Sequence, residues 1–542
     1  MLFLNARHLY QSTLARSLLL GFCVLTAGCS FEVNSTDDRA DASPGDGVCA
    51  DRLGLCTLRA AVTEAHESLG TYRIIIPEGT YELTLPVSDP NGGALKILSN
   101  MQLQGAGPAQ TIIDAGGRYG VIQVEAGSDV ALNYLQITDG DNQAGGGLRV
   151  NAGDVSLYNV HIHDNHSVTG GAGLYVLPGA SVEGDLVEFT DNNADGAFGG
   201  GAWNQGELRL RQSLFANNDS NRAGALHNSP DTILNLYNVT MSGNTAHSPT
   251  RGTGGIHQNG FAVLRNVTIT NNVGRQSSGN IAAGGISTVA GRITVLKNTL
   301  IANNTKIINS GGSPVPSDCT GAVSSDSRYN LMEDHAECTL PALTTSWVLD
   351  QDPNLSALGN NGGATRTHAL LFSSPAIDAG FPFPPGSPAA DACRALDQRG
   401  VPRPQKLSSN SGEALCDIGA YEAGNLPAFI QGFMLVDADS DSDIAPLRHG
   451  DILVLDNLPP NLSIRAISNG APGSVRFDYD ATINIRTENV APYAIGGDTA
   501  GDYLPFALTG GTHRLSATPY ALADADGAGG GGIAIEFQVI AP

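Results

Sequence analysis

A histidine-rich stretch is the part of this sequence whose residue types best fit a chemical site. It contains His161, His163, Asp164 and His166. Imidazole and carboxylate groups at such spacing can bind a metal ion or act as general bases. Because Ile162 separates the first two histidines, a β-strand would point both imidazoles outward, roughly 7 Å apart. The alternative is a set of exposed polar strand residues without chemistry. We expect this alternative and assign no catalytic residue and no metal.

Other combinations of residues that would indicate a polysaccharide-cleaving enzyme are missing. Lyases need a lysine or arginine base beside calcium-binding acids, and the related hydrolases need a tight acid cluster with Gly-His-Gly and Arg-x-Lys elements. Between residues 72 and 320 the only lysines are Lys96, Lys297 and Lys306, too few for a cleft that holds an acidic polysaccharide. We therefore expect binding or display without a cofactor. The alternative is a carbohydrate-active enzyme, either a polysaccharide lyase or a glycoside hydrolase.

A run of alternating aspartates near the C-terminus is a second candidate for metal binding. Asp437, Asp439, Asp441 and Asp443 could ligate calcium, but no glycine follows at the turn position and Arg448 stands where the terminal acid is expected. A solvated hairpin is the prediction for this run.

Six of the eight cysteines fall into neighbouring pairs. The pairs are Cys49 with Cys56, Cys319 with Cys338, and Cys393 with Cys416. Nearness in sequence favours these local disulfides over the other pairings that six cysteines allow. No two cysteines have the spacing of zinc ligands, so zinc is not expected.

The first residues have the form of a secretory signal. Arg7 and Arg16 precede an apolar stretch, 18–25, which is too short to span a bilayer. The following Leu-Thr-Ala-Gly-Cys, ending at Cys29, resembles the bacterial lipoprotein box, in which the cysteine is acylated. This predicts a signal peptide at 1–28, a lipid on Cys29, a polar tether at 29–48 and an outer-membrane lipoprotein at the cell surface or outside the cell. The alternative is simple cleavage after Gly28, which would leave the protein in the periplasm or secreted.

The charge of the chain limits its partners. The formal net charge is −24, and loss of Arg7 and Arg16 with the signal would make the mature chain more acidic still. Such a chain repels phosphate backbones, so nucleic acid is excluded as a partner. A polysaccharide or a cell-surface protein remains.

Asparagine recurs in one frame through the middle of the chain. The positions are Asn165, Asn192, Asn218, Asn244, Asn272 and Asn304. An apolar residue stands three positions before each, for example Ile162, Phe189 and Phe215. A short repeat of this kind cannot bury its apolar face alone, so its copies must stack into a solenoid.

The local pattern of the repeat predicts a parallel β-helix. Runs such as 236–241 and 264–269 alternate apolar with polar residues, as strands with one buried face do. Each run ends at Asn, Asp or Gly, and a second short strand opened by glycine follows. The β-helix is expected over residues 72–345, and from about residue 72 to 320 there is room for around ten rungs, a rod on the order of 50 Å long. The asparagines would form an internal side-chain ladder at a corner. The loops 244–255 and 272–285 are the longest, so we expect them to recognise a partner.

The start of the rod needs a cap, because a β-helix leaves an open sheet edge at its end. Residues 49–71 supply a helix with Thr57 as its N-cap and Leu58, Ala61, Val62, Ala65 and Leu69 as its apolar stripe. Cys56 to Val62, followed by Ile74-Ile75-Ile76-Pro77-Glu78-Gly79-Thr80-Tyr81, resembles the CSLREA motif of secreted bacterial right-handed β-helix proteins. The repeats are also similar to those of polymorphic outer-membrane proteins. These resemblances imply a right-handed parallel β-helix.

Residues 346–425 resemble a second family. Six blocks, at 352–355, 358–363, 367–370, 374–380, 397–400 and 416–422, are similar in order to the choice-of-anchor Q module. That family closes β-helices in surface proteins and has no established activity. We expect its charged residues to pair internally, with Arg399 bonded to Asp397 or Asp417.

The last part of the chain, 427–542, follows a different pattern. Seven separate short strands are predicted there, which suggests an immunoglobulin-like sandwich. The predicted strands are 429–436, 451–455, 462–466, 474–477, 482–486, 512–517 and 533–539. The whole chain is thus expected to be an all-β surface protein in which a rod, an anchor-type module and a sandwich act by binding, adhesion or display.

Overall fold

The computed structural model describes residues 30–541 except for 68–69, 126–128, 197, 249–251, 277–281, 310, 343–344, 372–373, 384–391, 406–413, 425–428, 448–450, 470, 521 and 527–532. The expected signal peptide and Cys29 lie outside the described residues. Within the described part, no helix is long and apolar enough to cross a membrane.

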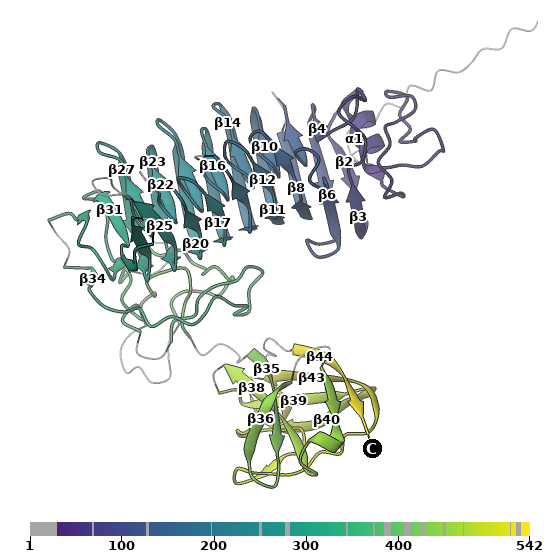
Figure 1. The fold of residues 1–542 in the computed structure, drawn as a ribbon, viewed down its shortest axis with the longest axis vertical. Helices are drawn as coiled ribbons and strands as arrows, with labels where there is room; N and C mark the ends of the chain where they lie inside the picture. The colour runs from purple at the N-terminus through teal and green to yellow at the C-terminus, as the bar shows by residue number, and fades with distance from the viewer. Residues whose placement is uncertain are drawn as a thin grey trace, which may run out of the picture.

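The rod is a parallel β-helix with three faces, as predicted (Figure 1). Its long sheet contains β1 (Ser30–Glu32), β2 (Tyr72–Ile75), β3 (Gly79–Glu82), β5 (Met101–Gln104), β6 (Thr111–Asp114), β8 (Asp129–Thr138), β11 (Gly153–His163), β14 (Ala180–Thr190), β17 (Glu207–Ala216), β20 (Ile233–Ser242), β23 (Phe261–Arg265), β24 (Thr268–Thr270), β27 (Ile293–Lys297), β28 (Leu300–Ala302), β32 (Leu331–Met332) and β34 (Val348–Leu349).

Two further sheets complete the rungs. The second sheet contains β4 (Leu95–Ile97), β7 (Ile122–Val124), β10 (Leu148–Val150), β13 (Leu174–Val176), β16 (Ala202–Asn204), β19 (Leu226–Asn228), β22 (Ile256–Gln258), β26 (Ile286–Thr288), β31 (Cys319–Ala322) and β33 (Cys338–Thr339). The third contains β9 (Asp141–Asn142), β12 (His166–Ser167), β15 (Asn193–Ala194), β18 (Asp219–Ser220), β21 (Thr245–Ala246), β25 (Val273–Gln276), β29 (Thr305–Ile308) and β30 (Pro314–Pro316). The last rung runs to Leu349, slightly beyond the expected boundary at 345.

The apolar column of the repeat fills the core of the rod. Ile162 pairs in register with Phe189, which pairs with Phe215, and all three are fully buried. The two phenylalanine rings stack with their centroids 4.6 Å apart. Identical positions therefore pack on one another from rung to rung, as the repeat predicts.

A tight bend precedes each ladder asparagine. The residue just before it has a positive φ, as at Asp164 (52°), Asp191 (55°) and Asn217 (56°), and Gly243 (70°) occupies the same place. Asn, Asp and Gly tolerate this left-handed conformation best. The repeat uses these residue types because the chain turns from the long sheet into the third sheet at this position.

The N-terminal cap includes the segment that was expected to be a tether, and that expectation is wrong for residues 30–48. β1 pairs in parallel with β2, and Val33 is buried in the rod core. Asp38 forms a buried ion pair with Arg59, and both Glu64 carboxylate oxygens accept backbone N–H bonds from 45 and 47. The segment folds because its charged side chains find buried partners here.

The cap helix α1 (Leu58–Glu67) follows the prediction. The Thr57 hydroxyl accepts the N–H of Ala60 at 3.0 Å, as an N-cap does. Leu58, Ala61, Val62 and Ala65 pack into the rod core, whereas Leu69 lies outside the described residues.

The anchor-like module, residues 350–424, packs against the side of the rod. Its described residues contain only isolated bridges, such as Gly359 with Thr367. It lies along the outer face of the long sheet, toward the C-terminal end of the rod (Figure 1). Leu300 and Leu331 of the rod share an apolar core with Leu370 and Ile418 of the module.

The C-terminal domain is a two-sheet sandwich, as predicted. One sheet contains β35 (Phe429–Asp437), β36 (Ser442–Leu447) and β38 (Leu462–Asn469). The other contains β37 (Ile452–Val454), β39 (Ser474–Tyr479), β40 (Thr482–Glu488), β43 (Gly511–Tyr520) and β44 (Ile533–Ile540), and β41 (Asp498–Thr499) pairs with β42 (Asp502–Tyr503). Two short 3-10 helices, η1 (Leu455–Asn457) and η2 (Ala523–Ala525), lie between strands. All seven predicted strands are present, and β36, β41 and β42 were missed; in β36, Asp443 and Pro446 mask the strand pattern.

Candidate functional site

One column of outward-facing residues crosses the long sheet and forms the candidate site. It consists, in register, of Ile112, Gln136, His161, Glu188, Leu214, Thr240, Thr268, Leu300 and Leu331, and is called the outward column below. From Leu214 onward the column is buried. Before Leu214 the column holds Gln136, His161 and Glu188, on β8, β11 and β14, preceded by Ile112 on β6.

The module covers the buried part of this column. The Thr240 hydroxyl donates to the Gln398 side-chain oxygen at 2.7 Å, and the Thr268 hydroxyl accepts the N–H of Ala420 at 2.9 Å. Glu188 lies where the module ends. There the backbone N–H of Arg366 donates to Oε1 of Glu188 at 3.0 Å, and its Nη2 lies 3.4 Å from Oε2.

The turn 360–366 of the module thus overhangs β11 and β14. Thr365 fixes it to the rod by donating to the carbonyl of Gln212 at 2.9 Å. Gly363 is required in this turn because a Cβ there would lie 2.8 Å from the Cα of Arg399. The overhang leaves a groove between the two parts of the chain.

The groove has a volume of about 370 Å³. This falls within the range of small-molecule sites, about 300–1,000 Å³. Its lining consists of Pro108, Ala109, Gln136, Asn159, Val160, His161, Leu186, Glu188, Asn360, Gly363, Ala364, Thr365 and Arg366. Three of these are amides that keep hydrogen-bonding capacity. No bond to another described residue occupies the side chains of Gln136 or Asn159, and Asn360 uses only its oxygen, toward the N–H of Gly362.

The lining is electrically balanced. Burial, with help from His163 and Arg366, lowers the pKa of His161 to about 3, so its imidazole is neutral at physiological pH. The only carboxylate of the lining, Glu188, is paired with its only cation, Arg366. The groove therefore offers hydrogen-bond donors and acceptors without a net charge.

Of the other members of the histidine cluster, only His163 lies beside His161, and it lies closer than the roughly 7 Å expected along a strand. The rings of His161 and His163 lie together, with centroids 4.3 Å apart, and His163 is bonded to Asp164. His166 lies beyond the corner, on the third sheet, between Asp141 and Asp195. Burial lowers its pKa, but the bonds to these two carboxylates outweigh burial and raise it. Among the described residues no group of histidine, cysteine and acidic side chains has a geometry that would hold a metal.

The interpretation of the three histidines as exposed is wrong, because all of them are half-buried, and the change matters most for His161. Its imidazole is half-buried at the groove, with Nε2 2.9 Å from the Thr190 hydroxyl. The module that covers this face lies about two hundred residues later in the sequence, so the local pattern gave no sign of the cover.

The asparagine ladder is confirmed. Each side-chain Nδ2, from Asn165 through Asn272, donates to the side-chain oxygen of the next asparagine at 2.8–2.9 Å. The same oxygens accept the backbone N–H of the preceding asparagine. The ladder ends on Asp318, which accepts from both nitrogens of Asn304 and was not identified from the sequence.

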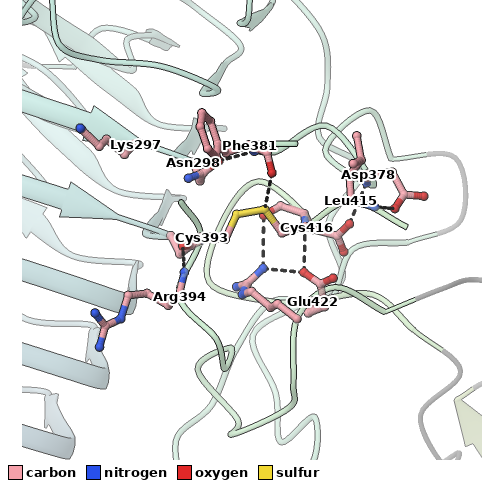
Figure 2. The surroundings of a disulfide bond; sticks show 12 residues. Lys297, Asn298, Asp378, Phe381, Cys393, Arg394, Leu415, Cys416 and Glu422 are labelled. Atoms are coloured by element: carbon pink, nitrogen blue, oxygen red, sulfur yellow. Dashed lines mark hydrogen bonds and ion pairs between the residues drawn. A yellow bond between two sulfur atoms is a disulfide. The ribbon is translucent and has the colours of Figure 1, made fainter. Parts of the chain in front are cut away.

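The three predicted disulfides are also confirmed. They join Cys49 to Cys56, Cys319 to Cys338, and Cys393 to Cys416. Figure 2 shows the last of these beside Phe381, whose N–H is bonded to Asn298 of the rod. This disulfide therefore stabilises the part of the module that contacts the sheet.

The ion pairs of the module agree with the prediction in part. Arg399 pairs with Asp397, and both are buried. Asp417 does not pair with Arg399. Its carboxylate accepts backbone N–H groups of Asp378 and Ala423, and Arg403 pairs with Glu422. Burial and the neighbouring Glu422 raise the pKa of Asp417 well above its usual value. These charged groups are bonded to one another or to the backbone inside the module, so none of them is available for catalysis.

The aspartate run of the sandwich is a hairpin turn, as expected. Asp443 pairs with Arg465, Asp439 accepts from Asn461, and Asp441 accepts the N–H of Tyr503. A separate cleft of about 670 Å³ lies elsewhere in this domain, lined mainly by leucine, proline and Phe506. The loops 244–255 and 272–285 include residues outside the described part, and no site is built on them.

An aromatic column on the second sheet was missed by the sequence analysis. Tyr175 stacks on Trp203 with centroids 4.4 Å apart, and His227 stacks on His257 at 5.0 Å. Phe198 lies between the two pairs, in contact with Trp203 and His227. Because the ring faces are turned toward one another, this column stabilises the sheet and leaves little face for a ligand.

The comparisons with known proteins show no family. No protein-family model matches the chain, and no curated protein matches it. One solved structure, that of the pectate lyase Pel9A, is similar: it is 16% identical, covers 73% of this chain and 97% of its own length, and superposes with a TM-score of 0.38. A likeness at this level carries no conclusion about activity.

Proposed function

We propose that this protein is an extracytoplasmic binding protein that recognises its ligand in the groove between the rod and the module. The observation that carries the proposal is the change along the outward column. Where the module covers it, the column is packed, and where the module leaves it open it presents the half-buried His161 and Gln136, whose side chain bonds to no other described residue. Unpaired polar groups that converge in a cavity of this size are typical of a ligand site.

The location outside the cytoplasm is part of the proposal. Three disulfides and the signal-like N-terminus support an oxidising compartment. A lipid on Cys29 would anchor the protein at the outer membrane. Because β1 begins at Ser30, such an anchor would hold the capped end of the rod close to the bilayer without a flexible tether.

Binding is favoured over catalysis by the composition of the groove. Most glycoside hydrolases use two carboxyl groups about 5–9.5 Å apart. Glu188 is the only carboxylate that lines the groove, and Arg366 already pairs with it. With a pKa of about 3, His161 is a weak general base.

A glycan array and a cell-binding screen with the soluble chain from Ser30 onward test the proposal. Residues 30–48 must be included because they belong to the cap. We expect saturable binding that Ala364→Trp abolishes by filling the groove, since Ala364 is an exposed residue of the lining. Ala357→Trp, at an exposed position of the module outside the lining, is the matched control.

An assay for unsaturated or hydrolysed sugar products is run on the same glycans. Release of product that stops when His161 is replaced by alanine would move the enzyme interpretation ahead of binding. Binding that survives Ala364→Trp unchanged would place the ligand outside the groove.

A further inference from the structure

The groove also indicates which chemical class of ligand it accepts, an inference that rests on the proposed function. Amide side chains present a donor and an acceptor at once. Gln136, Asn159 and Asn360 bring three of them to one cavity, each with capacity not used by the described protein. Sugar hydroxyls also donate and accept hydrogen bonds, so they are suitable partners for these amides.

The charges of the groove argue against an anionic ligand. The guanidinium of Arg366 already faces the carboxylate of Glu188. A carboxylated sugar would have to displace Glu188 or leave one charge without a partner, and unpaired buried charges are unfavourable. The net charge of −24 also repels a polyanion before it reaches the groove.

The apolar part of the lining fits the carbon faces of sugar rings. Leu186 of the rod lies in the same cavity as Pro108 and Ala364, whereas Val160 is buried in the rod core. Tyr158, directly before Asn159, is 41% exposed but does not line the cavity, and its ring packs edge-on against Tyr134, so the aliphatic residues form the apolar face of the cavity.

We infer that the groove binds an uncharged oligosaccharide segment, held by the amides of Gln136, Asn159 and Asn360. Gln136 is the best residue to test because it lies on a regular strand, whereas Asn159 has a positive φ that disfavours most replacements.

The experiment measures the affinity of the soluble chain for neutral cello-, xylo-, manno- and malto-oligosaccharides and for oligogalacturonate by calorimetry. We expect one neutral series to bind, with affinity insensitive to added sodium chloride. Gln136→Ala should weaken that binding about 3- to 10-fold, the value of one hydrogen bond.

Gln136→Lys separates the ligand classes. For a neutral sugar the added cation removes an acceptor and weakens binding, whereas for a uronate it adds an attractive charge and strengthens binding. Gln143→Lys, at an exposed position outside the lining, makes the same charge change and should have no effect.

Binding of oligogalacturonate that Gln136→Lys strengthens, or binding of peptides alone, would overturn the inference about the ligand while leaving the groove as the site. Absence of binding to every probe, on the array and on cells, would count against the proposed function itself. The melting temperature of each variant shows whether it is folded.

Discussion

At the residue scale, the ladder asparagines at one corner of the rod link successive rungs through buried side-chain hydrogen bonds. Each ladder asparagine is fully or nearly fully buried, and its amide satisfies groups on both neighbouring rungs. A buried amide is tolerated only when its donors and acceptors are paired. A regular repeat meets this condition by making every asparagine the partner of the next, and for this reason the ladder could be predicted from spacing alone.

Replacement of Asn244 by alanine should destabilise the rod by about 2–5 kcal/mol, because the backbone and side-chain N–H groups of Asn218 would lose their shared acceptor inside the core. Asn235 lies on the same rung, half-buried, with no side-chain bond to the described protein. Asn235→Ala should change stability by less than about 1 kcal/mol. Urea denaturation of both variants measures the difference, and equal losses would contradict the role of the ladder.

Asp318 makes the end of the ladder sensitive to pH. Burial raises the pKa of its carboxyl to about 7, although N–H groups of Asn304 and Asp334 lower it. The folded pKa then exceeds the unfolded one, so the folded state binds more protons between about pH 4 and pH 7. The contribution of Asp318 to stability is thus fully present below about pH 4 and is lost as pH rises to 7, by at most about 1.4 kcal/mol per pH unit.

Asp318→Asn should remove this component of the pH dependence. The asparagine keeps an acceptor for Asn304 but cannot ionise, so the difference in unfolding free energy between variant and parent should grow in favour of the variant from pH 4 to pH 8. Denaturation curves across that range provide the measurement. A constant difference at all pH values would show that Asp318 does not titrate there.

At the scale of elements, the alternation of residues along each strand of the long sheet determines which side chains face the core and which face outward. Inward positions such as Ile162 and Phe189 were predicted by periodicity because burial in the rod depends only on the local repeat. The residues one position earlier form the outward column. The residue types of this column change along the rod, from Gln136, His161 and Glu188 to leucine and threonine from Leu214 onward. This change was visible in the sequence. What the sequence did not provide was the covering partner, because the hydrogen bonds between residues 351–424 of the module and the rod join residues that are 83 to 186 positions apart.

Gln398 is the residue through which the module fixes the groove to the sheet. Its buried amide accepts from Thr240 and donates to Thr365 and to the carbonyl of Arg366. Gln398→Ala should loosen the turn 360–366, so hydrogen exchange there should accelerate about 10-fold or more, with loss of about 1–3 kcal/mol. Gln405→Ala, which removes only a bond exposed to solvent, is the control. Unchanged exchange in the turn would show that other contacts hold it.

At the scale of the whole molecule, the division into rod, module and sandwich was predictable because each part has its own periodicity and turn content. The cap was predicted too short, because residues 30–48 contain no repeat and fold through single contacts, such as the pairing of β1 with β2 and the ion pair of Asp38 with Arg59. The docking of the module on the side of the rod depends on many single bonds and one shared core, and none of these produces a pattern in the sequence.

Cys29→Ser tests how the molecule is held in place. The variant should leave the membrane fraction or accumulate as a precursor, because stable attachment requires more than one acyl chain on the cysteine. Fractionation with radiolabelled palmitate measures this, and Cys23→Ser, at the other cysteine of the N-terminal region, inside the expected signal peptide, controls for effects of losing a thiol. Membrane retention without any label would contradict lipid attachment.

The most direct test of the central claim is radical footprinting by mass spectrometry, with and without the oligosaccharide that binds most tightly. We predict protection in three peptides together: those containing 153–163 and 180–190 of the rod and 359–367 of the module, which are the segments that meet at the groove. Protection confined to the loops 244–255 and 272–285, or to the leucine- and proline-lined cleft of the sandwich, would contradict recognition in the groove.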